Sequence, residues 1–204
     1  MKQVEINTAL IIKELKSGEF KKFNHLVEKL KNSGLALAYR IIKNHQDAED
    51  ILQESFIKLY SSLINSEFKA FASIKTYFYR LVYNTAIDYY RKVFRKRLNI
   101  FSIDVNSSHY EDGSELHFEI MADTFDFGKF NLDELVAKYL DYLPPQYSII
   151  LTLYYINELN YEEISEILGI PMGTVKNRLF RAREKFKRLL LKHFTEKELI
   201  ENIS

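Results

Sequence analysis

Apolar residues recur every three or four positions through most of the chain, the spacing that places them on one face of an α-helix. Residues 47–63 and 74–92 show this spacing most clearly. Further helices are expected from Asn131, a helix-capping residue type, to just before Pro144-Pro145, and across residues 147–157. No strand-like alternation continues for more than a few residues. The pattern therefore predicts an all-α protein.

Residues 160–182 are expected to form two helices joined by a tight turn. Asn160 is placed to cap the first helix, and Gly169 permits the left-handed backbone conformation that ends it. Pro171 turns the chain, and Thr174 suits the cap or first turn of the second helix. This is the spacing of a helix-turn-helix, whose second helix enters the DNA major groove. The side chains expected to face inward are Ile164, Ile167, Leu168, Val175, Leu179 and Ala182.

Basic and polar side chains occupy the remaining faces of this second helix. Lys176, Asn177 and Arg181 are the candidates for contacts with base edges. Arg178 and Arg183 are better placed for phosphates. The alternative interpretation is a basic helix face that only contacts solvent.

Charge is unevenly distributed, although the formal net charge is only +1. Residues 75–98 contain seven Lys or Arg and one acid, and residues 175–192 contain eight Lys or Arg and one acid. Residues 101–128, between them, contain seven Asp or Glu and no Lys or Arg. We therefore expect two basic segments that bind an acidic partner, joined by a loop-like acidic connector.

The predicted helix over residues 47–63 gathers carboxylates on its polar side. These acids are Asp47, Glu49, Asp50 and Glu54. His45 lies beside them, so a metal site is one interpretation. A carboxylate-bridged site would need Glu-x-x-His patterns on other helices, and we find none in the sequence. A docking face for a basic partner is the better interpretation.

Composition and motifs exclude several classes of protein. The 204 residues include no cysteine, which rules out disulfides, thiolate metal sites and thiol catalysis. The start of the chain interrupts its apolar residues with charges, so neither a signal peptide nor membrane insertion is expected. The five histidines are scattered, and there is no glycine-rich phosphate loop. We expect a non-enzymatic cytoplasmic protein with no cofactor and no metal.

Four stretches carry a resemblance to a known family. YEEISEILGIPMGTVKNRLFRAR resembles the region 4 helix-turn-helix of extracytoplasmic-function sigma factors of bacterial RNA polymerase, and LPPQYSIILTLYYINELNYEE resembles the stretch before it. DAEDILQESFIKLY is similar to the core-binding region 2.2, and SIKTYFYRLVYNTAIDYYRK to the segments that melt the promoter and read its −10 element. The stretches occur in the family's order and cover most of residues 25–98 and 131–192.

The resemblance implies two small helical domains joined by an acidic flexible linker. The expected divisions are an N-terminal extension at 1–20, a region 2 domain at 21–98, the linker at 99–130 and a region 4 domain at 131–204. The implied partners are core RNA polymerase, double-stranded and melted promoter DNA, and an anti-sigma factor. The protein would be cytoplasmic, held at the membrane only through such an anti-sigma factor.

The resemblance also assigns roles to individual positions. The residues expected at the −35 element are Thr174, Lys176, Asn177, Arg178, Phe180, Arg181 and Arg183. Those expected at the −10 element are Phe68, Lys69, Phe71, Lys75, Tyr77, Asn84, Asp88 and Arg91, with Asp88 as an orienting partner for a nearby basic residue. Those expected to bind the clamp coiled coil of the polymerase's largest subunit are Asp47, Asp50, Gln53 and Glu54.

Promoter melting needs rings on which unpaired bases stack and cations that hold the strand. The loop around Phe68 and Phe71, followed by Lys75 and Tyr77, supplies both. Tyr77 stands where the family usually has Trp, and Ile74 where Phe is common, so the stacking area is reduced. For Phe71 and Tyr77, burial in the core is an alternative of equal weight.

Two other classes of function stay open at this point. A stand-alone helix-turn-helix regulator with an N-terminal sensing or dimerisation domain would bind duplex DNA tightly without polymerase. A purely protein-binding helical module is the third interpretation. The helix over residues 147–157 is apolar nearly all round, which fits either deep burial or a surface for the polymerase flap or an anti-sigma factor.

Overall fold

The computed structural model describes residues 8–65, 68, 73–94 and 132–195. Within these ranges the chain forms helices and no strand, which confirms the predicted all-α class. The linker predicted for residues 99–130 lies outside them. The first half contains α1 (Thr8–Lys16), α2 (Lys21–Ile42), α3 (His45–Ile64) and α4 (Ile74–Phe94). The second half contains α5 (Leu132–Asp141), α6 (Pro145–Leu151), the π-helical turn η2 (Thr152–Ile156), α7 (Tyr161–Leu168) and α8 (Met172–Leu191).

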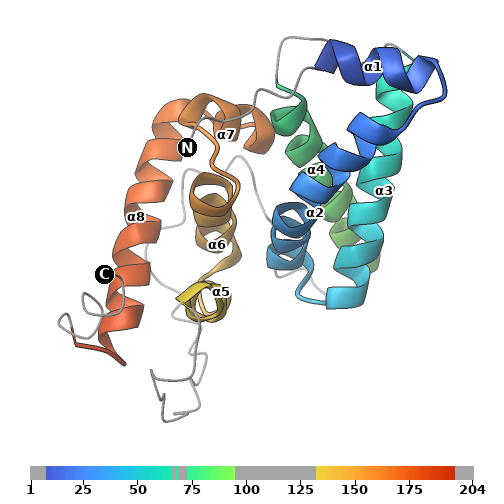
Figure 1. The fold of residues 1–204 in the computed structure, drawn as a ribbon. Coiled ribbons are helices and arrows are strands. Elements are labelled where there is room, and N and C mark those ends of the chain that lie inside the picture. Colours follow the sequence, from blue (N-terminus) through green and yellow to red (C-terminus); the bar gives the residue numbers. More distant parts are fainter. Residues whose placement is uncertain (1–7, 66–67, 69–72, 95–131, 196–204) are drawn as a thin grey trace.

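Helices α2, α3 and α4 pack against one another, and α1, from the predicted N-terminal extension, lies against α2 and α3 (Figure 1). Asn44 begins α3 as a cap, because its side chain accepts a hydrogen bond from the Asp47 amide at 3.1 Å. Gly34 lies where α2 passes directly against side chains of α3 and α4. A Cβ atom there would lie 2.8 Å from Leu52 Cδ1 and 2.9 Å from Phe78 Cε1.

We expect Gly34→Val to lower the free energy of unfolding by about 1–3 kcal/mol, because the added methyl groups would overpack the contact with Leu52 and Phe78. Chemical denaturation followed by circular dichroism measures this loss. Gly173→Val is the matched control, since Gly173 is also helical but has no atom within 4 Å of an added Cβ. Equal losses in both variants would show that backbone propensity, and not packing, determines the effect.

In the second half, α5, α6 and α7 each pack against α8. The predicted helix over residues 147–157 is confirmed, beginning at Pro145 and continuing as η2. The helix expected before Pro144 is confirmed as α5, which ends at Asp141. No helix in the described part of the chain combines the length and the apolar character that crossing a membrane requires.

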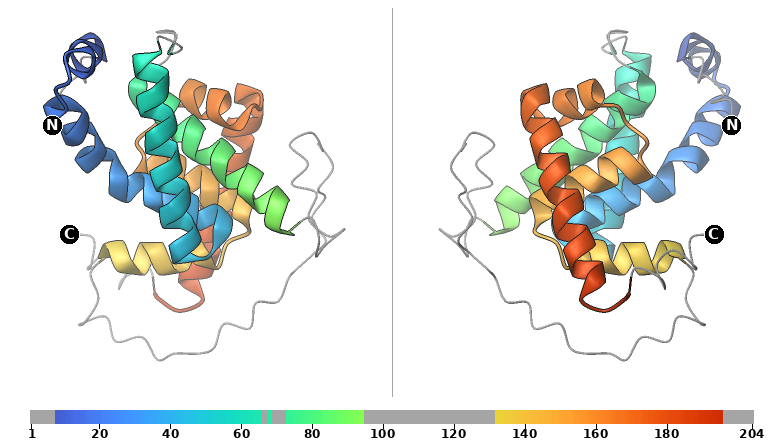
Figure 2. Two further views of the ribbon diagram at one scale, coloured as in Figure 1. Left: turned by 90° about the vertical axis from the view of Figure 1, so that its right-hand side faces the viewer. Right: turned by 90° about the vertical axis from the view of Figure 1, so that its left-hand side faces the viewer.

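The two halves are in direct contact (Figure 2). Helix α7 lies against α4, while α6 and η2 lie against α2. Most buried apolar residues of both halves therefore belong to one continuous core. A small separate cluster joins α5 to the chain after α8 through Leu135, Tyr139 and Phe194. The sequence did not predict this contact between the halves.

Candidate nucleic-acid interface and docking face

Local hydrogen bonds fix the start of the predicted helix-turn-helix. The Asn160 side chain accepts from the Glu163 amide, and the Glu163 carboxylate accepts from the Asn160 amide, both at 2.9 Å. This reciprocal pair forms a capping box at the start of α7. Gly169 ends α7 with φ at +65°, and the Ser165 hydroxyl donates to the Ile170 carbonyl at 2.6 Å. The predicted cap and left-handed glycine are both confirmed.

Helix α8 begins after Pro171, so Thr174 lies in its first turn, as expected. The side chains predicted to face inward on both helices are all buried, namely Ile164, Ile167, Leu168, Val175, Leu179 and Ala182. The opposite side of α8 is exposed and carries Thr174, Lys176, Asn177, Phe180 and Arg181. Phe180 is 65% exposed, so its ring is accessible to a partner on the same side of α8 as these polar residues.

Arg178 and Arg183 differ from the other predicted −35 contacts because they flank the buried side of α8. Arg178 is half-buried, and burial lowers the pKa of its guanidinium, while the nearby Tyr83 and Tyr147 act in the opposite direction. The Arg183 guanidinium lies 5.2 Å from the ring centre of Tyr154. Aromatic faces attract such cations. In this structure both side chains are therefore engaged within the protein, and their predicted phosphate contacts stay predictions.

The predicted −10 segment is only partly described, because Lys69 and Phe71 lie outside the described residues. Phe68 and Tyr77 are half-buried, with ring centres 5.1 Å apart in an edge-to-face contact. The Tyr77 hydroxyl donates to Ser62 Oγ at 3.0 Å. The guanidinium of Arg80 lies 5.3 Å from the Tyr77 ring centre. Packing thus uses part of both rings, in line with the alternative that they belong partly to the core.

The rest of this segment lies along α4. Asn84, Asp88 and Arg91 are exposed, as expected for a polar stripe. Arg91 lies 4.0 Å from Asp88, which agrees with an orienting role for this carboxylate. Lys75 is half-buried and lies 3.9 Å from Glu158 of the second half. Sequence reasoning did not find this contact.

The acidic side of α3 is largely open to solvent. Asp50, Gln53 and Glu54 are exposed, whereas Asp47 is half-buried and its hydrogen bond raises the pKa of Tyr89. Beside them, sequence reasoning missed Ile57, which is 65% exposed. The sequence could have revealed Ile57, because a residue three positions after Glu54 in a helix lies on the same face as Glu54. An open hollow of about 350 Å³ lies next to this face, lined by Lys31, Asn32, Leu35, Glu49, Leu52 and Gln53.

Comparison with known proteins agrees with these features in both halves. Residues 26–96 match the family model for sigma-70 region 2, and residues 133–186 match the model for sigma-70 region 4. The chain is 33% identical over 183 residues to the ECF RNA polymerase sigma factor SigW of Bacillus subtilis strain 168, covering 88% of this chain and 94% of that protein. It is 30% identical over 180 residues to the ECF RNA polymerase sigma-E factor of Haemophilus influenzae, covering 88% and 93%.

Solved structures show the same fold. The sigma factor RpoE from Bartonella quintana, in complex with the anti-sigma factor NepR, has a TM-score of 0.59 at 22% identity, over 83% of this chain and 97% of that chain. CnrH, in complex with the cytosolic domain of CnrY, has a TM-score of 0.60 at 19% identity, over 93% and 99%. Because relatives at 30% identity or more are matched over nearly their whole length, the chain belongs to the extracytoplasmic-function sigma factors of the sigma-70 family.

Proposed function

We propose that this sigma factor divides promoter recognition between its halves, with α8 reading the −35 element as duplex. The exposed side of α8 carries this proposal, because Lys176, Asn177 and Arg181 supply donors for base edges in the first half of a helix against which α5, α6 and α7 pack. Phe180 adds an apolar group suited to a thymine methyl. A stand-alone regulator is disfavoured, since such a protein has no need for the region 2 match over residues 26–96.

The start of α4 and the loop before it hold the opened −10 strand in this proposal. Tyr77 offers a ring for base stacking, and Lys75 offers a cation for the backbone. Farther along α4, exposed Asn84 suits an adenine edge, and Arg91, oriented by Asp88, suits a phosphate. The −10 and −35 surfaces then lie in different halves of the chain.

The acidic side of α3 binds core polymerase in this proposal, through Asp47, Asp50, Gln53 and Glu54. The exposed carboxylates supply charge for a basic partner, and Ile57 supplies an apolar contact among them. This combination of an apolar centre and a charged rim is typical of protein interfaces.

We expect Asp50→Lys with Glu54→Lys to weaken binding to core polymerase about tenfold or more, because like charges would then face each other. Titration of fluorescently labelled polymerase measures the affinity, and circular dichroism checks that helix content is unchanged. A matched control reverses two exposed acids of the same half that lie off α3, Glu19→Lys with Glu28→Lys. Equal affinities in the two double variants would mean that the α3 face contacts only solvent.

We infer that the protein acts in the cytoplasm, without catalytic activity or a cofactor, and is regulated by an anti-sigma factor. Regulation by an anti-sigma factor is supported by the similarity in fold to RpoE, whose solved structure is a complex with the anti-sigma factor NepR. An exposed apolar edge also supports it, since Tyr155 is 58% and Ile156 37% exposed on η2. Ile150 and Leu151, earlier in the helix predicted over residues 147–157, are buried, so the exposed apolar surface is at the end of this helix.

Transcription with purified core polymerase tests the proposed function. The full chain should direct polymerase to a specific set of promoters in a genomic DNA library and should expose unpaired thymines near −10. A stand-alone regulator would instead select and bind duplex sites tightly without polymerase, and that result would refute the proposal.

A further inference from the structure

Three tyrosine rings lie along one edge of α8 and contact two of its cations. Tyr161, the first residue of α7, stacks on Tyr154 of η2 with ring centres 5.5 Å apart, and Tyr154 meets Tyr155 edge to face at 4.9 Å. The Lys176 ammonium lies 6.0 Å from the ring centre of Tyr161. The Arg183 guanidinium lies 5.2 Å from the ring centre of Tyr154 and 5.5 Å from that of Tyr155. Aromatic faces attract cations at such distances.

The geometry of α8 places both cations on this edge. Lys176 and Arg183 are seven residues apart, which is nearly two full turns of an α-helix. Lys176 is exposed and borders the proposed DNA-reading side, because Phe180 follows it by one turn. The ring of Tyr161 therefore lies beside a lysine that is able to reach DNA.

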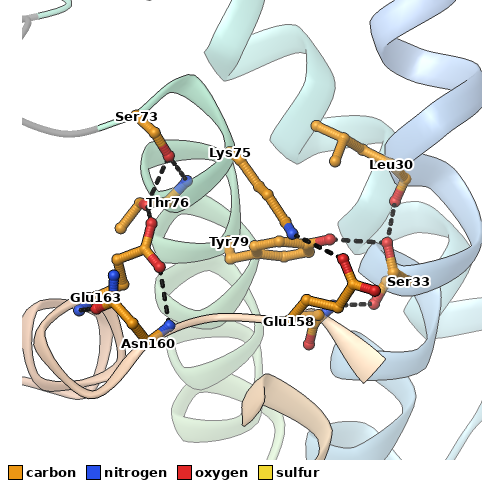
Figure 3. A network of polar contacts seen from close by, with 10 residues as sticks. Leu30, Ser33, Ser73, Lys75, Thr76, Tyr79, Glu158, Asn160 and Glu163 are labelled. Atoms are coloured by element: carbon orange, nitrogen blue, oxygen red, sulfur yellow. Dashed lines mark hydrogen bonds and ion pairs between the residues drawn. The ribbon is translucent and has the colours of Figure 1, made fainter. Parts of the chain in front are cut away.

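Hydrogen bonds on two sides fix the position of Tyr161. Tyr161 lies within the capping box of α7, and the Glu163 carboxylate of that box also accepts a hydrogen bond from the Thr76 hydroxyl of α4 at 2.5 Å (Figure 3). On the other side, Arg183 donates hydrogen bonds to the Tyr155 and Tyr161 hydroxyls. Burial lowers the pKa of the Arg183 guanidinium, but these two tyrosines raise it by more, so that its pKa lies above the usual value. Arg183 thus joins the start of α7 to η2.

An ordered lysine side chain reads a base more effectively than a mobile one. The lysine stem is long and flexible, and immobilising such a side chain on binding costs free energy. A ring that already holds the ammonium lowers this cost. We propose that Tyr161 is a positioning residue for −35 recognition, and that its ring holds Lys176 in the orientation that reads a base edge. This inference rests on the proposed role of α8.

The test measures how well the holoenzyme discriminates between two promoters that differ only in the −35 element. We expect Tyr161→Leu to lower the ratio of the two affinities about two- to tenfold, because Lys176 keeps its charge but loses the ring that orders it. Tyr161→Phe keeps the ring and should preserve the ratio. Tyr147→Leu is the matched control, since the Tyr147 ring centre lies 5.6 Å from the Lys185 ammonium, on the opposite edge of α8, and its loss should leave the ratio unchanged.

A double-mutant cycle separates positioning from general damage to the fold. Because Tyr161 acts through Lys176, Tyr161→Leu should have no further effect on the ratio once Lys176 is replaced by alanine. Equal losses with and without Lys176 would overturn the inference, and so would an unchanged ratio in Tyr161→Leu alone. A loss in Tyr161→Phe as large as in Tyr161→Leu would also overturn it, because the ring would then not be the group that matters.

A measurement on the wild-type chain does not depend on the folding of Tyr161→Leu. The ring of Tyr161 should shift the NMR resonances of the Lys176 methylene next to the ammonium upfield, and unshifted resonances would overturn the inference. Lys176→Ala alone tests the proposed function, because an unchanged ratio would mean that α8 does not read the −35 element through Lys176. A lower ratio in Lys176→Ala but not in Tyr161→Leu would remove only the positioning role of Tyr161.

Discussion

Replacing Lys176 and Arg181 together by alanine is expected to weaken holoenzyme binding to a preferred −35 element by about 2–6 kcal/mol. Each side chain is exposed in the first half of α8, and a side chain that reads a base edge contributes about 1–3 kcal/mol of discrimination. The loss should fall mainly on the preferred sequence, so that the ratio of specific to non-specific binding collapses. Equilibrium binding to matched promoters that differ only in the −35 element measures it.

Arg188→Ala is the control for this result. Arg188 is exposed on α8 about two turns beyond Arg181, so its loss removes one charge without touching the start of the helix. It should weaken all sequences alike and reduce the dependence of binding on salt. If the double variant also lost affinity equally on every sequence, α8 would hold the DNA backbone without reading it.

The helix-turn-helix could be predicted from the sequence because its determinants are local. Asn160 and Glu163 cap α7 across three residues, and Gly169 ends it at positive φ. The 3.6-residue period then identifies which side of α8 is buried and which is exposed. The same reasoning correctly placed Asn84, Asp88 and Arg91 on an exposed stripe of α4.

Side chains at the border of a buried face were harder to assign. Arg178 and Arg183 have the charge and spacing of phosphate contacts, yet Arg178 is half-buried and Arg183 lies against the ring of Tyr154. Their surroundings come from α4, α6 and η2, and a single helix period does not reveal what packs along its edge. Hence the sequence predicted which residues of the −35 surface are exposed, but it did not predict that Arg178 and Arg183 beside them are partly buried.

Contacts between the halves lay beyond sequence reasoning for a related reason. Arg80 and Glu166 are 86 positions apart, and Arg40 and Asp141 are 101 apart. In the sequence, each is one charge among many on an amphipathic helix. Only tertiary packing selects the pairs, and it does so at positions that the resemblance assigns to DNA or leaves unassigned.

Tyr77→Leu is expected to impair promoter melting while leaving closed-promoter binding intact. Leucine keeps an apolar side chain against Phe68 but removes the flat ring on which an unpaired base can stack, a contact worth about 1–3 kcal/mol. That loss corresponds to roughly a five- to 150-fold decrease in the open-to-closed ratio. Permanganate reactivity of thymines in the −10 region measures opening, and the −35 surface on α8 is unchanged.

Tyr77→Phe is the matched variant, since it keeps the ring and removes only the hydroxyl that donates to Ser62. If stacking is the role of Tyr77, this variant should melt promoters almost normally, whereas the leucine variant should need a premelted template for normal transcription. If both variants melt promoters equally well, Tyr77 serves only to pack against Phe68 and Arg80. If the phenylalanine variant fails as badly as the leucine variant, the bond to Ser62, and not the ring, supports melting, because that bond is the contact both variants lack.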